Sequence, residues 1–224
     1  MHVMRVFWFF LCLLPAACGQ TAVEDVVRVL IWPIPVPAGI FGNGTQDRAA
    51  EWDREEAEAR PGQPALALSL GRRQALASLH QTQGERRLWR TAGGLVVATD
   101  GARVVATSGL SEMVAATRFD GPDPLASPLV LSGREARTRR MVDLMRLGRR
   151  PDGMSFGVTL ECQLRVAEAD EDSLLVEERC RGDAVFTNRF WVDPRSGAVF
   201  RSEQWIGRGL PPLIVEVISP PPAN

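Results

Sequence analysis

The chain has 224 residues, of which 45% are hydrophobic, and a formal net charge of -1. This length suits one domain with a small appendage, and the composition excludes a disordered chain. A net charge this close to zero also excludes a strongly basic nucleic-acid-binding surface. Every one of the 26 Lys+Arg residues is an arginine, which we attribute to genomic composition rather than to function.

The N-terminal segment has the layout of a secretion signal. A single cation, Arg5, precedes the apolar block 6–14, and small residues then surround Cys18. A membrane-spanning helix needs roughly twenty consecutive apolar residues. Because Pro15 interrupts this block well before that length, we predict that the segment is removed rather than retained as a span.

Cys18 is the predicted lipid anchor. Two small residues, Ala16 and Ala17, stand directly before it, as in a bacterial lipoprotein signal, although Pro15 occupies the place where leucine is usual. Residues 1–17 would then be the signal peptide, and Cys18 would carry acyl chains such as palmitate. Ordinary cleavage after Gly19, which would discard Cys18, is the alternative.

The segment that follows is predicted to be a tether rather than part of the core. Residues 21–32 have the apolar spacing of a short helix, and the Pro-rich stretch 33–39 then favours an extended chain. A second short polar helix is expected within 46–62. We therefore divide the mature chain into an anchored segment, 18–45, and a single β-rich globular domain, 46–224.

From Pro64 onward the pattern changes to short alternating runs separated by turn residues. The Gly93-Gly94 and Asp100-Gly101 pairs indicate turns, and Asp-Gly between alternating apolar runs is a strong hairpin signal. Residues 134–147 are ambiguous between helix and strand, and alternation at Thr138, Val142 and Leu144 favours a strand. The predicted fold class is mainly β, an antiparallel β-sandwich or barrel-like sheet with short N-terminal helices.

Two cysteines remain once the signal is removed and Cys18 is lipidated. Cys162 and Cys180 lie in neighbouring predicted strands joined by an acidic turn. An even pair in an exported chain indicates a disulfide, worth about 3 kcal/mol in the chain-entropy model. A zinc site is not indicated, because no second cysteine pair or nearby histidine completes it.

The stretch 188–206 is predicted to be a hairpin with a Pro-containing turn that ends at Gly197. If the strand register holds, four apolar side chains face inward: Phe190, Val192, Phe200 and Ile206. Three polar side chains of the same stretch would satisfy buried backbone groups: Asn188, Ser202 and Gln204. A stable hairpin is the simplest interpretation of this region.

This stretch also resembles a known family, the YjbF outer-membrane lipoproteins, which include the GfcB proteins of group 4 capsule clusters. The matching features are Asn188, the run 190–193, Gly197, Ser202 with Gln204, Gly207 and the closing apolar strand. A second patch agrees, from Trp89 through "TDGARVVATSGL".

The resemblance implies a mainly β lipoprotein, active in exopolysaccharide or capsule production and encoded with an outer-membrane β-barrel partner of the YjbH type. It implies neither enzymatic activity nor a cofactor. Gly19 replaces the aspartate that signals inner-membrane retention, so the resemblance leads us to expect the outer membrane, with the domain on the periplasmic side.

The residues offer little catalytic chemistry. His80 is the one histidine left after the signal is removed, and the chain has neither a nucleophile elbow nor a phosphate-binding glycine loop. A glycosidase needs two carboxylates, and four acids could be nominated: Asp100, Glu112, Asp193 and Glu203. Each lies where a turn or an exposed strand face would normally carry an acid, so we predict no catalytic residues and no metal site.

Three functions remain open at this stage. The first is a non-enzymatic accessory lipoprotein for polysaccharide export, the second a periplasmic glycan- or lipid-binding β module, and the third a polysaccharide hydrolase. Residues that would carry the resemblance or form a partner or glycan surface are Trp89, Asn188, Trp191, Gln204 and Trp205. Trp89 and Trp191 are more typical of a core, because aromatic side chains beside apolar strand neighbours are usually buried.

Overall fold

The computed structural model describes residues 62–146, 153–169 and 171–221. The predicted signal peptide, Cys18, the tether and the N-terminal helices all lie outside the described residues. Within them, the fold is almost entirely strand, and the helices are two short 3-10 turns. The expectation of a mainly β, antiparallel, barrel-like sheet is confirmed.

Twelve strands form one antiparallel sheet. Their bounds are β1 Ala65–Leu70, β2 Arg73–Gln83, β3 Arg86–Thr91, β4 Val96–Asp100, β5 Arg103–Ser108, β6 Glu112–Asp120, β7 Ala136–Arg146, β8 Met154–Ala169, β9 Leu174–Gly182, β10 Phe186–Val192, β11 Val199–Gln204 and β12 Leu213–Ser219. The 3-10 turns η1, Pro124–Ala126, and η2, Pro128–Leu131, connect β6 to β7.

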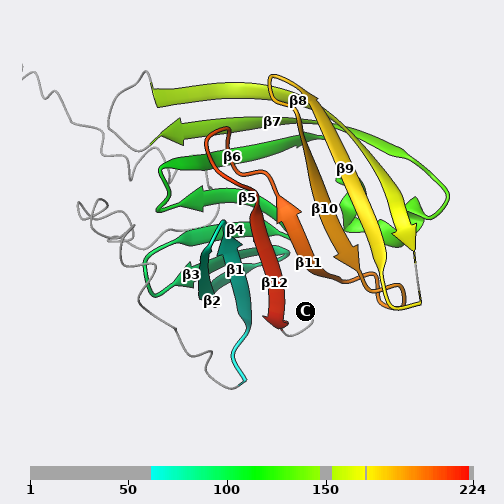
Figure 1. Cartoon of the computed structure of the whole chain (residues 1–224), viewed down its shortest axis with the longest axis horizontal. Coiled ribbons are helices and arrows are strands. Elements are labelled where there is room, and N and C mark those ends of the chain that lie inside the picture. The colour runs from blue at the N-terminus through cyan, green and yellow to red at the C-terminus, as the bar shows by residue number, and fades with distance from the viewer. Residues whose placement is uncertain (1–61, 147–152, 170, 222–224) are drawn as a thin grey trace, which may run out of the picture.

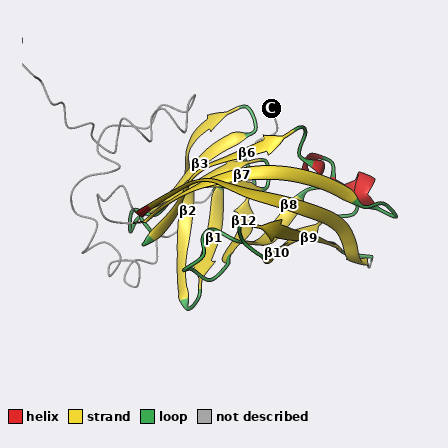
Figure 2. Cartoon of the chain, turned by 90° about the horizontal axis from the view of Figure 1, so that it is seen from above, coloured by secondary structure: helices red, strands yellow, loops and turns green. Residues whose placement is uncertain are grey.

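The sheet is rolled so that its two outermost strands meet. The strand order runs β5-β4-β3-β2-β1-β12-β11-β10-β9-β8-β7-β6, and the curled sheet is visible in both views (Figures 1 and 2). No backbone ladder is formed between β5 and β6 in this described sheet, but Val114 of β6 donates its N–H to Thr107 Oγ1 of β5. The result is a nearly closed barrel.

The strand prediction for the ambiguous region 134–147 is confirmed, because β7 covers most of it. Thr138, Val142 and Leu144 are buried on one face, whereas Arg139 and Met141 between them are exposed. A period of two is a strand period, so burial on one face outweighs the helix propensity of the residues. The predicted Asp100-Gly101 turn also joins β4 to β5, with Gly101 at φ +54°.

Two apolar clusters, a larger one and a smaller one, fill the interior of the barrel. The larger includes Leu68, Trp89, Val97, Leu160 and Ile206. The smaller lies under η1 and η2 and includes Leu125, Leu131, Leu164, Val176 and Phe190. Along β9, Val176 belongs to the smaller cluster and Cys180 to the larger one. Glu178 lies between them, which marks a polar layer across the core.

The inward set predicted for the hairpin of β10 and β11 is correct at three positions and wrong at Phe200. Phe190, Val192 and Ile206 are all 0% exposed, but Phe200 is 41% exposed. The register shifts here, since Trp191 pairs with Arg201 while the next residue, Val192, pairs with Val199. Phe200 is the extra residue of this β-bulge and therefore leaves the inward row.

The connection from β11 to β12, residues 205–212, folds over one end of the barrel and reaches β6. Gly209 donates its N–H to Glu112 Oε2 at 2.8 Å. Gly207 lies so close to this carboxylate, at φ +148°, that a Cβ there would collide with Glu112 Oε2. Ile206 and Leu210 of the same connection pack against the larger apolar cluster. The segment is thus part of the folded core rather than a free loop.

Candidate functional site: a buried charge layer

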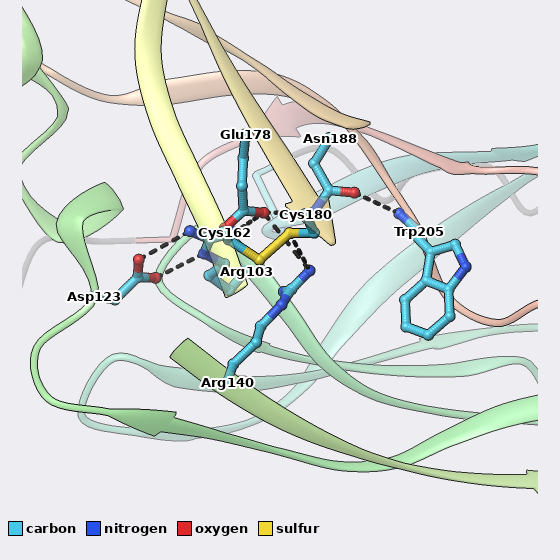
Figure 3. Close-up of a disulfide and its surroundings, with 8 residues drawn as sticks. All are labelled: Arg103, Asp123, Arg140, Cys162, Glu178, Cys180, Asn188 and Trp205. Atoms are coloured by element: carbon cyan, nitrogen blue, oxygen red, sulfur yellow. Dashed lines mark hydrogen bonds and ion pairs between the residues drawn. A yellow bond between two sulfur atoms is a disulfide. The ribbon is translucent and has the colours of Figure 1, made fainter. Parts of the chain in front are cut away.

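The polar layer is built around a salt bridge between β5 and β9. Arg103 Nη1 donates to Glu178 Oε2 at 2.6 Å, and the two side chains are 1% and 0% exposed. On its other side Arg103 donates from Nε and Nη2 to the two oxygens of Asp123, at 2.7 and 2.9 Å. Figure 3 shows Asp123 facing Arg103 in this way. Asp123 also accepts from Leu125 N and so caps η1. One arginine therefore joins β5, β9 and the cover of the smaller cluster.

A second buried arginine, Arg140 of β7, approaches the same carboxylate less closely. Its Nη2 lies 3.6 Å from Glu178 Oε2 and donates to Cys180 Sγ at 3.7 Å. Aromatic rings line both guanidinium groups: Phe119 and Phe190 lie 5.3 and 5.0 Å from Arg103 Cζ, and Phe186 lies 5.4 Å from Arg140 Cζ. Such stacking is favourable for a desolvated cation.

Burial and the neighbouring charges shift the pKa of Glu178 in opposite directions. Burial alone would raise the pKa of this carboxyl, but the attraction of Arg103 and Arg140 and two hydrogen bonds leave the pKa below its ordinary value. Burial also lowers the pKa of Arg140, against the attraction of Glu178, whereas Glu178 and Asp123 outweigh burial and raise the pKa of Arg103. The lowered pKa of Glu178 favours its charged form, and a guanidinium stays protonated in proteins, so the layer consists of one carboxylate between two cations, with Asp123 at its edge.

The disulfide predicted between Cys162 and Cys180 is present beside this layer. The two residues are direct partners in the register of β8 and β9 and are 2% and 1% exposed. Their sulfurs and a Glu178 oxygen lie within 4.8 Å of one another. Because the sulfurs are bonded to each other, they offer no thiolate for a metal ion.

Asn188 extends the layer toward the end of β11. It donates from Nδ2 to Glu178 Oε2 at 2.6 Å and accepts from Trp205 N at 2.8 Å. Trp205 stacks on Phe186 with ring centroids 4.5 Å apart, and Figure 3 shows the tryptophan at the edge of the charge layer. Asn188 thus satisfies a backbone N–H, in the way the sequence predicts for it.

Gln204 links opposite walls of the barrel. Its side-chain amide accepts from Val104 N at 2.9 Å and donates to Ala102 O at 2.8 Å. These two backbone groups belong to the free side of the edge strand β5 and its preceding turn, so the amide takes the place of a missing strand. Ser202 Oγ accepts a further hydrogen bond from Gln204 Nε2. Gln204 thus satisfies backbone groups as predicted, whereas the hydrogen bond of Ser202 is with a side chain, that of Gln204.

The tryptophans of the predicted surface do not share one face. Trp89 is 3% exposed and donates from Nε1 to Thr99 Oγ1 at 3.1 Å, which places it in the core. Trp191 is half-buried between inward-facing Phe190 and Val192, with Arg201 5.1 Å above its ring. Because Asn188 and Gln204 are also buried, only Trp191 and Trp205 of the five residues are partly open to solvent.

The four nominated acids do not form a pair. Asp100 lies in a salt bridge with Arg86, and Glu203 lies 3.3 Å from Arg189. Asp193 accepts from Arg195 N, and this backbone hydrogen bond lowers its pKa. Glu112 is buried against Gly209. Each acid thus has a structural partner of its own, and His80 is an exposed residue of β2.

The centre of the layer was not predicted from the sequence. Charged residues in alternating strands normally face solvent, so no inward charge was assigned to Arg103, Arg140 or Glu178. A usable signal exists for two of them, because Arg140 falls between buried Thr138 and Val142, and Glu178 between buried Val176 and Cys180. Arg103 has no such signal, since its neighbour Val104 takes the inward position. Charged residues are rarely buried unless they are paired, which makes such positions informative.

The sequence profile of the family described as "Group 4 capsule polysaccharide lipoprotein gfcB, YjbF" matches residues 39–218. The chain therefore belongs to this family of capsule-associated lipoproteins, and the suspected resemblance is confirmed. A similar fold is found in the crystal structure of the hypothetical lipoprotein YmcC from Escherichia coli (K12). The TM-score is 0.62 at 21% identity, covering 79% of this chain and 96% of that one.

None of the curated proteins matches the sequence. Within the described ranges, no helix has the length and apolar character needed to cross a membrane. The predicted anchor, Cys18, lies outside those ranges.

Proposed function

We propose that this protein is an outer-membrane lipoprotein, anchored through Cys18, that assists capsule or exopolysaccharide production or export without catalysing a reaction. Its domain would stand on the periplasmic side and act as an accessory to an outer-membrane β-barrel protein of the YjbH type. The observation that carries the proposal is the family match over 39–218, which includes nearly all of the described strands.

The interior of the barrel supports a structural rather than a catalytic role. The charged groups of the buried layer pair with one another through Glu178 Oε2, while Glu178 Oε1 and Arg140 Nε have no hydrogen-bond partner among the described residues. The pKa of Glu178 is lowered, which favours the charged carboxylate over a group that exchanges a proton near neutral pH. A ligand cavity is also less well supported. The largest fully buried side chains, among them Arg103, Phe190, Leu68 and Gln204, occupy the inward positions that a glycan or lipid would need.

The anchor is tested by metabolic labelling with palmitate and membrane fractionation. The wild-type protein is expected to take up label and to sediment with the outer membrane, whereas Cys18→Ser is expected to do neither. The matched control is Cys162→Ala/Cys180→Ala, which removes the other two cysteines of the mature chain and should still be labelled. Equal labelling of Cys18→Ser and wild type would contradict the anchor.

The role is tested in the source bacterium by deleting the coding sequence and measuring polysaccharide at the cell surface. Output should fall, and it should return with the wild-type protein but not with Cys18→Ser. Cross-linking in cells followed by mass spectrometry should identify a β-barrel protein of the outer membrane. Normal polysaccharide output in the deletion strain would overturn the proposed function.

A further inference from the structure

The turns at the two ends of the barrel differ in charge. One end, here named the basic end, comprises the described turns after β1, β3, β5, β9 and β11 with the last residue of β7, and the other, here named the acidic end, the described residues of the turns after β2, β4, β6, β8 and β10, each with the strand-terminal residues beside it. Among the described residues, the charged residues at the basic end are mainly arginines: Arg72, Arg73, Arg146 and Arg208, with the acids Asp183 and Glu112. Acids outnumber arginines in the described part of the other end: Glu85, Asp100, Asp120, Asp123, Glu135, Glu171, Asp172 and Asp193, with Arg86, Arg103, Arg134 and Arg195.

Segment 205–212 links the positions of three of these arginines. Arg208 lies between the two glycines that contact Glu112, and Arg146 Nε lies 3.6 Å from Glu112 Oε1, the other oxygen of the same carboxylate. Arg72 follows Gly71, where an ideal Cβ would be 3.8 Å from Pro211. Arg208 thus belongs to the segment, Arg72 follows a residue beside it, and Arg146 approaches a carboxylate that the segment contacts, so the three lie at one end of the barrel although they are distant in sequence.

The cationic groups of this cluster remain accessible. All three arginines are exposed, and the Arg146 side chain is 69% exposed. Glu112 is buried, and its Oε2 is already bonded to Gly209 N. Arg208 donates to the backbone oxygen of Asp183, not to its carboxylate, which accepts from Thr159 N instead. The carboxylate of Asp183 is therefore engaged elsewhere, and Glu112 is shared between Gly209 N and Arg146 Nε. Each guanidinium group has five N–H donors, so these contacts leave donors for an external anion.

We propose that the basic end is a docking surface for an acidic polysaccharide that carries carboxylate groups. Guanidinium groups bind carboxylates with two parallel hydrogen bonds, and several of them along one edge suit a polymer with repeated charges. The acidic end would repel the same polymer, which fixes the side of the barrel that it meets. The choice of a polysaccharide rests on the proposed function, since the family is associated with capsule polysaccharide.

The test measures binding of the full chain, in a neutral detergent, to immobilised polygalacturonate and to immobilised dextran, an uncharged glycan. Wild type should bind the polyuronate and not dextran, and the affinity should fall as salt is added. The variant Arg72→Gln/Arg146→Gln/Arg208→Gln should bind at least about tenfold more weakly, because three charge-assisted contacts are lost.

The matched control removes three arginines from the acidic end, Arg86→Gln/Arg134→Gln/Arg195→Gln, and should bind as wild type does. Thermal unfolding of both triple variants checks that the fold is retained. Absence of binding by wild type, or equal weakening in the two variants, would overturn the assignment. Tighter binding to phosphatidylglycerol vesicles than to polygalacturonate would do the same, because it would make a lipid headgroup the preferred anion.

This result is separable from the proposed function. If the deletion strain loses polysaccharide but the protein does not bind polygalacturonate, the accessory role is supported and the docking surface is rejected. If the protein binds polygalacturonate but the deletion strain is unaffected, the docking surface is supported and the accessory role is rejected.

Discussion

Two consecutive carboxylates of β9, Glu177 and Glu178, show how the same chemistry differs across one sheet. Glu178 faces the interior, 0% exposed, with two almost fully buried arginines, Arg103 and Arg140. Glu177 faces outward at 14% exposure, among arginines whose side chains are 36–57% exposed: Arg165, Arg179 and Arg189. Both carboxylates pair with arginines, but only Glu178 and its two arginines are removed from solvent.

The difference teaches that burial, rather than the number of ion pairs, decides what a carboxylate contributes. An exposed pair is screened by solvent and typically contributes 1 kcal/mol or less, roughly, while removing one member of a buried pair leaves a desolvated charge and costs several times more. The inner layer is thus expected to fix how the walls of the barrel meet. The outer ladder is expected to matter mainly for solubility.

The largest expected effect is at Glu178. Glu178→Ala would leave Arg140 without a carboxylate partner among the described residues and Arg103 with Asp123 alone, and should lower the free energy of unfolding by about 4 kcal/mol. Glu177→Ala, one residue away, is the matched control and should cost about 0.5 kcal/mol. Urea denaturation followed by tryptophan fluorescence measures both. Equal losses of unfolding free energy in the two variants would show that burial does not distinguish Glu178 from Glu177.

Lowering the pH is expected to remove the contribution of Glu178 to the free energy of unfolding. The pKa of Glu178 in the folded chain is below its ordinary value of 4.5. Its contribution is therefore fully present above that value and is lost as the pH falls through the lowered folded pKa. Glu178→Gln, which keeps the shape of the side chain, should remove this part of the acid dependence. Denaturation at a series of pH values from neutral downward measures it, and a wild-type curve parallel to that of Glu178→Gln would contradict it.

The disulfide is expected to have the next largest effect. Cys162→Ala/Cys180→Ala should cost about 3 kcal/mol in the chain-entropy model, for a sequence separation of 18 residues. A reductant should leave the folded wild type oxidised, since both sulfurs are buried, and should act only once denaturant is present. Thiol labelling with and without urea tests this. Rapid labelling of the native protein would show that the interior opens more readily than the structure indicates.

The third largest loss of unfolding free energy is expected at Gln204. Gln204→Ala would leave Val104 N and Ala102 O without their partner at the edge of β5, at a cost of about 2 kcal/mol. Glu203→Ala, on the outward side of the same strand, should cost well under about 1 kcal/mol. Amide hydrogen exchange of Val104 gives a local measure, because its protection should fall in Gln204→Ala and not in the control.

The smallest effect is expected in the outer ladder itself. Arg189→Ala removes contacts with Glu177 at 3.7 Å and Glu203 at 3.3 Å, on a side chain that is 44% exposed. The change in unfolding free energy should be about 0.5 kcal/mol and should diminish in high salt, because the screening length is then only a few ångströms, about 3 Å at 1 M. A loss that persists in high salt would show that this arginine contributes by packing.

The strands were predictable from the sequence because their apolar residues alternate. Asp100-Gly101 indicates a hairpin that the structure contains, and the backbone contacts expected of Asn188 and Gln204 are present, whereas Ser202 bonds the Gln204 side chain instead. Phe200 was not predictable, since a bulge shifts the phase of a strand by one residue and alternation alone cannot locate it.

The charge layer was missed for a different reason. Arg103 and Glu178 are 75 residues apart, and their pairing depends on how tightly the sheet rolls. A period-two pattern fixes which face a side chain is on, but not which strand lies opposite across the core. The contact between segment 205–212 and Glu112 is likewise a property of the closed barrel.

The seam between β5 and β6 has a consequence for the proposed anchoring of this protein to a membrane. An open sheet offers two unpaired borders, and at high density each is a template for pairing with a neighbouring copy. Here the two borders face each other, joined by Val114 N and Thr107 Oγ1, and Gln204 occupies part of what remains. If copies are anchored side by side on one bilayer, as the proposed function requires, the two borders of the described sheet would be directed toward each other rather than toward a neighbouring copy.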